Sequence, residues 1–244
     1  MKFSIITICY NAAAVIERTL QSVTGQSWAD KEYIIVDGAS KDSTLDIVGK
    51  YREGIDILVS EPDKGLYDAM NKGLKLATGD YVLFMNAGDR FHEDTTLEQI
   101  ASQVQQLGFL PGVIYGNTAL TNIAGEIYGM RRLSPPEHLN WKSFKNGMLV
   151  CHQAFYARRD LAEPYDMKYR FSADVDWCIR VMKKADVLYN THLIVADYLE
   201  DGSGVTIDNR KASLKERFAI MRKHYGLLST LCYHAWFAVR LLFK

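Results

Sequence analysis

The sequence has few cysteines and prolines, no net charge and no low-complexity stretch. Its four cysteines, Cys9, Cys151, Cys178 and Cys232, are far apart and form no CxxC pair. We therefore expect reduced thiols in a reducing compartment and no zinc site. With 244 residues, of which 48% are hydrophobic and 24% charged, the chain is neither collagenous nor disordered. It suffices for one large α/β domain, or one domain with an appendage.

Long hydrophobic runs are also missing. We expect no signal peptide, because the apolar run 3–8 is too short for one, and we predict a cytoplasmic location. Residues 227–243 are apolar but include His234 and Arg240, and a stretch of about 17 residues is too short to span a bilayer. The segment 226–244 fits a helix lying peripherally on the inner face of the cell membrane. A helix packed on its own domain or on a second subunit is the open alternative.

The zero net charge hides an uneven distribution. Residues 206–244 hold eight Lys or Arg and two acidic residues, so this tail carries +6 and residues 1–205 carry −6. Such asymmetry favours an anionic surface or ligand for the tail. We expect no nucleic-acid partner. The oligomeric state stays open.

Strands alternate with helices over the first hundred residues, which predicts βαβ units and a mostly parallel sheet. A helix begins after Asn11 and another after Ser43. Past residue 89 we expect a hairpin at 117–133, a loop at 134–147 and helices at 173–184 and from 208 onward. The expected strands are 3–8, 33–36, 55–59, 81–85, 113–116, 150–156, 187–189 and 193–195.

The stretch 61–89 is the part of the chain in which we expect the centre of the functional site. It contains a glycine turn, a helix, a second glycine turn and the apolar strand 81–85, which ends in Asn86 and Asp89. Open α/β sheets bind ligands at the carboxyl edge of their strands, where these two residues are expected. Mg²⁺ takes one or two carboxylates together with substrate phosphates and waters, so Asp89 is a candidate metal ligand. A turn-forming role for Asp89 is the alternative.

Two further acidic segments are candidates. Asp37 follows a buried strand, where its carboxylate could accept from a base or from ribose hydroxyls, although a capping role explains it equally well. Asp174 and Asp176 open a helix, where acids are favoured by the helix dipole. Residues two apart on a helix point about 200° apart, so only one of them can face a cleft. The chain has neither GxxxxGK[ST] nor GxGxxG, which disfavours an NTPase or a dinucleotide-binding protein.

The runs SIITICYNAAAVIERTLQSV, YIIVDGASKDST and DKGLYDAMNKGLKLATGDYVLFMNAGD, in this order, resemble the family 2 glycosyltransferases. The resemblance covers roughly residues 1–205, is closest to bacterial enzymes of surface-polysaccharide synthesis, and extends to the segment CHQ at 151–153. It implies the GT-A fold, which is a single Rossmann-like, mostly parallel sheet flanked by helices, with a helical C-terminal extension. The expected domains are 1–205, divided into a nucleotide-sugar half (1–116) and an acceptor half (117–205), and the tail 206–244.

Residue roles follow from the resemblance. It implies that Asp89 holds Mg²⁺ or Mn²⁺ and that Asp174 is the general base, with Asp176 as the alternative because Ala173 stands where Glu is usual. Only one acid remains in Asn86–Asp89, where the family has two or three. His152, Arg131 and Arg132 are weaker candidates for acceptor or diphosphate contacts. The residues expected to contact the nucleotide sugar are Ile8, Tyr10, Asp37, Lys64, Gly65, Asn71 and Asn86.

The implied reaction moves one sugar from a nucleotide-diphosphate sugar to a hydroxyl of a glycan or lipid-linked acceptor, with inversion. The QxxRW signature of processive synthases is absent, so the transfer is expected to be non-processive. A nucleotide-sugar nucleotidyltransferase is one alternative, although the loop after the first strand lacks the glycines and cations it needs. A catalytically degenerate nucleotide-sugar-binding protein is the other, prompted by the reduced acidic motif. The sugar, base, acceptor and linkage stay open.

Overall fold

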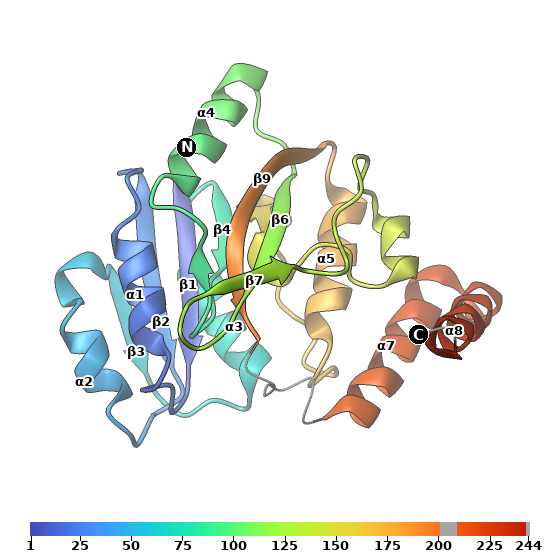
Figure 1. Ribbon diagram of the computed structural model, residues 1–244, viewed down its shortest axis with the longest axis horizontal. Helices are drawn as coiled ribbons and strands as arrows, with labels where there is room; N and C mark the ends of the chain where they lie inside the picture. The colour runs from blue at the N-terminus through green and yellow to red at the C-terminus, as the bar shows by residue number, and fades with distance from the viewer. Residues whose placement is uncertain (201–208, 243–244) are drawn as a thin grey trace.

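One sheet runs through the computed structural model, which describes residues 1–200 and 209–242; nine strands of these residues build it. Their order is β3-β2-β1-β4-β8-β6-β9-β5, with β7 paired to β6 (Figure 1). The strands are β1 (Phe3–Cys9), β2 (Lys31–Asp37), β3 (Ile57–Ser60), β4 (Tyr81–Phe84), β5 (Arg90–Phe91), β6 (Val113–Thr121), β7 (Ile127–Met130), β8 (Phe155–Arg158) and β9 (Leu188–Leu199).

Helices lie on both faces of this sheet (Figure 1). α3 packs against β1 and β2, α1 against β5, and α5 against α7. The helices are α1 (Ile16–Thr24), α2 (Thr44–Gly49), α3 (Leu66–Leu76), α4 (Thr96–Leu107), α5 (Ala173–Lys184), α7 (Arg210–Tyr225) and α8 (Leu227–Leu242). Two short 3₁₀ turns matter below, η2 (Trp141–Asn146) and η3 (His152–Ala154).

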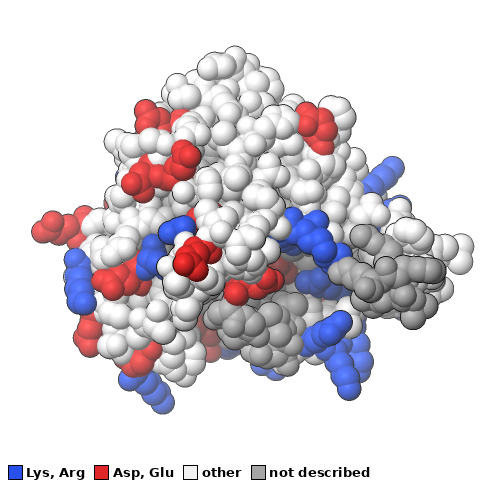
Figure 2. Space-filling model, in the orientation of Figure 1, with Lys and Arg blue, Asp and Glu red and all other residues white. Residues whose placement is uncertain are grey.

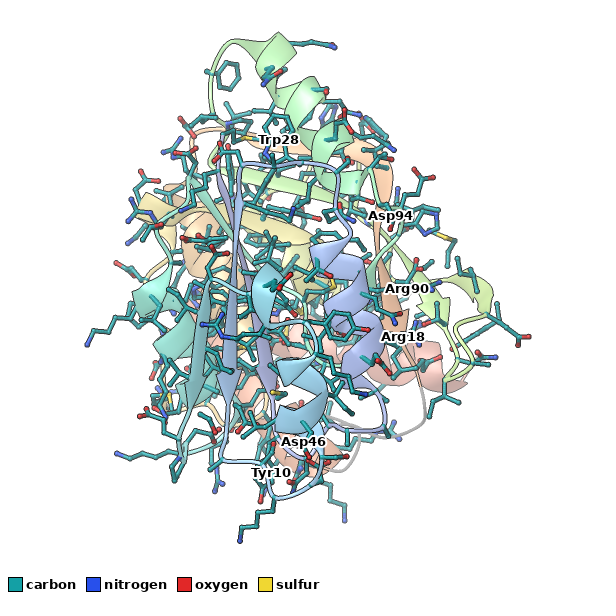
Figure 3. All side chains as sticks on the ribbon, turned by 90° about the vertical axis from the view of Figure 1, so that its left-hand side faces the viewer. Tyr10, Arg18, Trp28, Asp46, Arg90 and Asp94 are labelled. Carbon is teal, nitrogen blue, oxygen red and sulfur yellow. The ribbon has the colours of Figure 1, made fainter. Side chains whose placement is uncertain are left out.

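Strand direction brings the candidate residues to one edge. β1 to β4 are parallel, β8 is antiparallel to both β4 and β6, and β9 is parallel to β6. The carboxyl ends of β1, β2, β4, β6 and β9 therefore meet the beginning of β8. Tyr10 lies at this edge, whereas Trp28 lies at the opposite edge of the sheet (Figure 3). The predicted α/β fold, with a mostly parallel sheet flanked by helices and a helical C-terminal part, is confirmed.

Some local predictions need correction. The strand expected at 150–156 begins only at Phe155, because residues 152–154 form the turn η3. The strands expected at 187–189 and 193–195 are one strand, β9, in which His192 has a φ of 60° and the register with β6 shifts. The hairpin is confirmed as β6–β7. The predicted boundary between residues 205 and 206 lies outside the described residues, as does the end of the tail at 243–244.

Gly73 shows how closely α3 approaches the sheet. A Cβ added at Gly73 would lie 2.4 Å from Cγ2 of the buried Ile6 in β1. We expect Gly73→Ala to lower the free energy of unfolding by about 1–3 kcal/mol, because β-branched Ile6 cannot move aside. Urea denaturation measures this change. Gly49→Ala is the matched helix control: nothing lies within 4 Å of its added Cβ, and its effect should be neutral or stabilising by up to about 1 kcal/mol.

Candidate active site

The ends of β1 and β2 form one side of the site. Ile8 is buried, whereas the side chain of Tyr10 is 59% exposed at the carboxyl edge. A Cβ on Gly38 would lie 3.4 Å from the Tyr10 ring and 2.5 Å from the Asp63 carboxylate, so these three residues are neighbours. An exposed aromatic ring of this kind suits stacking against a base.

Asp37 is enclosed beneath that surface. Its carboxylate is fully buried and accepts from the backbone N–H of Ser40 (3.0 Å) and the hydroxyl groups of Ser40 (2.5 Å) and Ser60 (2.7 Å). These bonds tie the loop after β2 to the end of β3. A direct contact between Asp37 and a base therefore stays a prediction.

The start of α3 lies beside this surface. Gly65 has a φ of 112°, a conformation that favours glycine, and Lys64 is exposed just before it. Asn71 lies in the second turn of α3, and its side-chain amide makes two hydrogen bonds with the backbone of Tyr165. The Asn71 Oδ1 accepts from the Tyr165 N–H (2.7 Å), and the Asn71 Nδ2 donates to the Tyr165 C=O (3.1 Å). In this arrangement Asn71 fixes the segment before α5, and its predicted nucleotide contact gains no support.

The end of β4 carries the acidic motif. One Asp89 oxygen accepts from the Leu199 N–H (2.9 Å) and the other from the Gln153 amide (2.5 Å), and the side chain is buried. The Oδ1 of Asn86 is buried without a hydrogen-bond partner among residues 1–200 and 209–242. Within the same residues, no group of three or more His, Cys, Asp or Glu could hold a metal ion. The end of β4 thus presents one carboxylate, from Asp89, and one amide oxygen without a partner among the described residues, from Asn86.

Asp174 lies in the first turn of α5 and is half-buried. Its Oδ1 accepts from the Tyr67 hydroxyl at 3.0 Å. Burial, and then the negative charge of Asp174, raise the pKa of Tyr67 well above its ordinary value, so Tyr67 stays a protonated donor. The N-terminus of α5 also stabilises a negative charge at this position.

A cluster of packed aromatic rings, which includes Tyr67, lies beside Asp174. Tyr165 stacks on both Tyr67 and Trp177, at centroid distances of 5.4 and 5.0 Å. His152 stacks on Phe84 at 5.0 Å, and its Nε2 lies 2.7 Å from the Tyr165 hydroxyl. Burial lowers the pKa of His152 to about 4 against a smaller raising effect of Asp174, so its imidazole is neutral near pH 7. It therefore brings no charge to a diphosphate.

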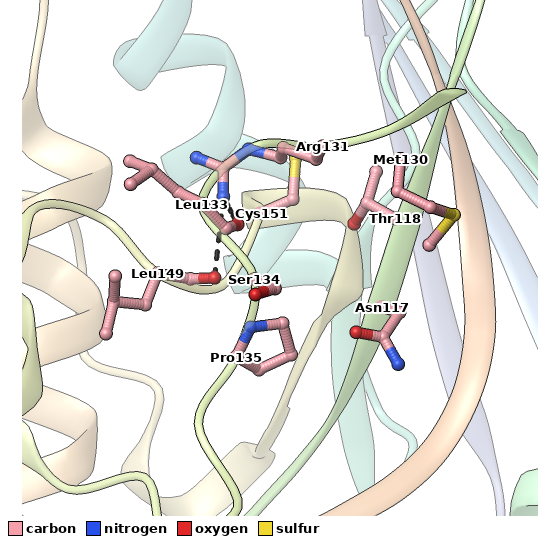
Figure 4. Close-up of a pocket in the computed structure, with 9 residues that line it drawn as sticks. All are labelled: Asn117, Thr118, Met130, Arg131, Leu133, Ser134, Pro135, Leu149 and Cys151. Carbon is pink, nitrogen blue, oxygen red and sulfur yellow. Dashed lines mark hydrogen bonds between the residues drawn. The ribbon is translucent and has the colours of Figure 1, made fainter. Parts of the chain in front are cut away.

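The two arginines predicted as contacts differ in setting. The Arg131 guanidinium donates to the carbonyls of Leu133 (2.7 Å) and Met148 (2.9 Å), while Arg132 is exposed. Arg131 lines a cavity of about 260 Å³ between β6 and the segment that follows β7 (Figure 4). Its walls are mostly apolar and include the side chains of Met130, Leu133, Pro135, Leu149 and Cys151.

Comparison with known proteins identifies the family. The family model described as "Glycosyl transferase family 2" matches residues 4–164. The chain belongs to this family. A PGL/p-HBAD biosynthesis glycosyltransferase of Mycobacterium tuberculosis is 36% identical over 82% of this chain and 77% of its own length. The putative teichuronic acid biosynthesis glycosyltransferase TuaG of Bacillus subtilis is 27% identical over 94% and 92%.

Solved structures share the GT-A fold of this family 2 glycosyltransferase. Staphylococcus aureus TarS residues 1–349, in complex with UDP-GlcNAc, superposes with a TM-score of 0.74 at 20% identity over 91% of this chain. The chain spans 65% of that TarS fragment. The mannosyltransferase PcManGT from Pyrobaculum calidifontis, in complex with GDP-Man and Mn²⁺, gives 0.57 at 16% identity, covering 98% of this chain and 80% of its own.

Asp176 has different surroundings from Asp174. It is fully buried and is bonded to Arg180 (2.7 Å), Lys223 (2.9 Å) and His224 (2.8 Å). Burial alone would raise the pKa of Asp176, but the hydrogen bonds from these three side chains outweigh it and hold the pKa below its usual range. A carboxylate enclosed by three partners is held as an anchor between α5 and α7.

Sequence reasoning missed the residues that hold the candidates in place. Tyr67 and Gln153 donate to Asp174 and Asp89, and Ser60 donates to Asp37. Tyr67 lies within the stretch 61–89, directly after the glycine turn. This position was the only feature of the sequence that could have indicated a role for Tyr67. Arg18 and Arg90 lie side by side (Figure 3), but they bind structural partners: Arg18 joins α1 to Thr121 of β6, and Arg90 joins β5 to Asp197 of β9.

We expect Asp176→Asn to cost about 1–3 kcal/mol in the free energy of unfolding at pH 7, because it removes the charge from a buried carboxylate that accepts hydrogen bonds from Arg180, Lys223 and His224. The folded-state pKa of Asp176 is lowered, so its contribution is complete above the unfolded value of about 3.9 and is lost as the pH falls below it. Denaturant unfolding at pH 7 and pH 3 should show a smaller difference between variant and wild type at pH 3. The exposed Asp46→Asn (Figure 3) is the control, with a change within about 0.5 kcal/mol. An equal cost at both pH values would contradict this role.

Proposed function

We propose that this protein is an inverting, non-processive glycosyltransferase that acts in cell-surface polysaccharide or glycolipid synthesis. It would move one sugar from a nucleotide-diphosphate sugar to a hydroxyl of a glycan or lipid-linked acceptor. The observation that carries the proposal is Asp174, half-buried beside a cluster of packed aromatic rings at the N-terminus of α5 and bonded to Tyr67. The names of the mycobacterial and Bacillus relatives, and the UDP-GlcNAc and GDP-Man in the fold neighbours, support the substrate classes.

In this proposal Asp174 takes the proton of the acceptor hydroxyl, whose oxygen attacks the anomeric carbon from the face opposite the leaving nucleoside diphosphate. The C–O bond to the diphosphate breaks as the new glycosidic bond forms, so a single displacement inverts the configuration. Tyr67 keeps the carboxylate oriented. Tyr10, Lys64 and Gly65 border the surface where the nucleotide would lie.

A divalent cation, Mg²⁺ or Mn²⁺, fits the end of β4. Asn86 supplies a buried amide oxygen with no partner in the described part of the chain, and Asp89 supplies a carboxylate three residues later. Mg²⁺ is commonly held by one or two carboxylates, with substrate phosphates and waters completing its shell. When bound, the cation would stabilise negative charge on the leaving diphosphate. The Mn²⁺ in the PcManGT complex is consistent with this assignment.

The cavity beside β6 is the place we propose for part of the acceptor. Cys151, which lines the cavity, precedes His152, and the negative charge of Asp174 acts on the His152 imidazole, so the cavity lies close to the proposed base. Its apolar walls suit a ring or an acyl-linked group more than a densely hydroxylated sugar.

The tail supports peripheral contact with an anionic membrane. α8 packs on α7 and η2 through Tyr233 and His234, and turns large apolar side chains outward. Lys and Arg gather on the lower right of this face of the molecule, where α7 lies (Figure 2). Among the described residues no helix is long and apolar enough to cross a membrane. Among the described residues of α8, the large apolar side chains that are exposed are Leu227, Leu228, Leu231, Trp236 and Val239.

Thermal shifts against UDP-, GDP- and dTDP-sugars, each with Mn²⁺ and with chelator, test the proposed reaction. We expect one nucleotide class to raise the melting temperature in a metal-dependent way. Asp174→Asn should keep this shift while lowering transfer by about 100-fold or more, because only the proton acceptor is removed. Asp46→Asn should retain both. No shift with any donor would contradict the proposed donor site, and transfer by Asp174→Asn would contradict the assignment of the base.

Sedimentation with vesicles of phosphatidylcholine and phosphatidylglycerol tests the tail. We expect the wild type to bind anionic vesicles and to be released by salt, because the attraction to the lipid headgroups is partly electrostatic. Leu228→Glu and Trp236→Glu should lower the bound fraction, since both side chains are exposed on α8. Ile123→Glu, on the β6–β7 turn, is an equally exposed control. An unchanged bound fraction in the α8 variants would exclude this surface, and concentration-dependent dimers that these variants abolish would favour a second subunit.

A further inference from the structure

The helix α7 contacts the segment that leads into α5. The Glu216 carboxylate accepts from the backbone N–H groups of Arg170 and Phe171, each at 2.8 Å, through its two separate oxygens. One turn earlier on α7, the Ser213 hydroxyl lies 2.8 Å from the hydroxyl of Ser172, and both side chains are buried. Three consecutive residues immediately before α5 are therefore held from one helix.

A second anchor follows on the other side of Asp174. Lys223 and His224, at the end of α7, bind the buried carboxylate of Asp176 at 2.9 and 2.8 Å. Asp174 thus lies between two points, residues 170–172 and Asp176, that are both fixed by α7. Its own side chain is free of these bonds and instead accepts from Tyr67.

Glu216 is suited to this role by geometry and by charge. A carboxylate that accepts two backbone N–H bonds restrains two peptide planes at once, and charge-assisted bonds of this kind are about twice as strong as neutral ones. Glu216 is also close enough to raise the pKa of Tyr67 slightly, after the larger effects of burial and Asp174. The family match ends at residue 164, so neither Glu216 nor the segment it holds belongs to the matched region.

We propose that Glu216 is a positioning residue for the reaction: its carboxylate fixes residues 170–172 and so sets the direction of Asp174. The proposal rests on the role of Asp174 proposed above. A small displacement of a reacting group costs rate and leaves donor binding unchanged, because the nucleotide surface is built by β1, β2 and α3 on another part of the edge.

Glu216→Gln and Glu216→Ala test this inference, with Lys215→Gln as the control, since Lys215 is the exposed neighbour on the same helix. The assay follows release of nucleoside diphosphate from the panel sugar that stabilises the wild type, well below each melting temperature. We expect kcat to fall about tenfold in Glu216→Ala and less in Glu216→Gln, which keeps one acceptor oxygen. KM for the nucleotide sugar should stay within about twofold, and Lys215→Gln should match the wild type.

Deuterium uptake provides a second readout. Amides in residues 168–174 should exchange faster in both Glu216 variants than in the wild type. The inference would be overturned if a folded Glu216→Ala variant kept the kcat of the wild type. It would also be overturned if a rise in KM accounted for the whole loss of kcat/KM. If neither Glu216 variant folds, Ser213→Ala decides: a reduced kcat with unchanged KM supports positioning by α7, and an unchanged kcat overturns it. A wild type with no turnover of any nucleotide sugar would instead refute the proposed function.

Discussion

The buried carboxylate of Asp89 joins the two halves of the sheet edge. It accepts from the end of β9 through Leu199 and from η3 through Gln153, while its backbone carbonyl accepts from Thr19 of α1 at 2.6 Å. A buried carboxylate is stable only when its lone pairs are satisfied, so these elements must meet at one point. The nucleotide side, built by β1 to β4, is thereby held in register with the side that carries η3 and the cavity.

Asp174 and Asp176 on α5 have the same side chain but different surroundings, and these surroundings favour different roles. Asp176 points inward, where three basic side chains enclose it, and Asp174 points about 200° away from it, is only half-buried and has Tyr67 beside it. The sequence left this choice open because both acids occupy the first turn of a helix and both benefit from its dipole. Burial and partners from distant parts of the chain distinguish them. The geometry therefore favours Asp174 as the group that faces a substrate.

The sequence predicts the sheet well because its signals are local. Alternation of apolar strands and amphipathic helices was sufficient for β1 to β4, α3 and α5, and the carboxyl-edge rule placed Asn86 and Asp89 correctly. The remainder depends on long-range contacts that no spacing encodes. Gln153 reaches Asp89 across 64 residues and Tyr67 reaches Asp174 across 107. The turn η3 lies in an apolar run that also fits a strand, and only its contacts with β4, β6 and β9 distinguish the two.

Two adjoining helices of the tail connect the surface that we propose for membrane contact with the segment that carries Asp174. The inner side of α7 carries Ser213 and Glu216, which hold the segment before α5, while Phe218 packs against His234 of α8 at 5.0 Å. α8 then presents its apolar side chains outward. α7 is bonded to residues 170–172 near its beginning and to Asp176 of α5 at its end, so packed side chains connect α8 with the first turn of α5. In the proposed function, this connection would hold a lipid-linked acceptor and the base Asp174 in a fixed arrangement.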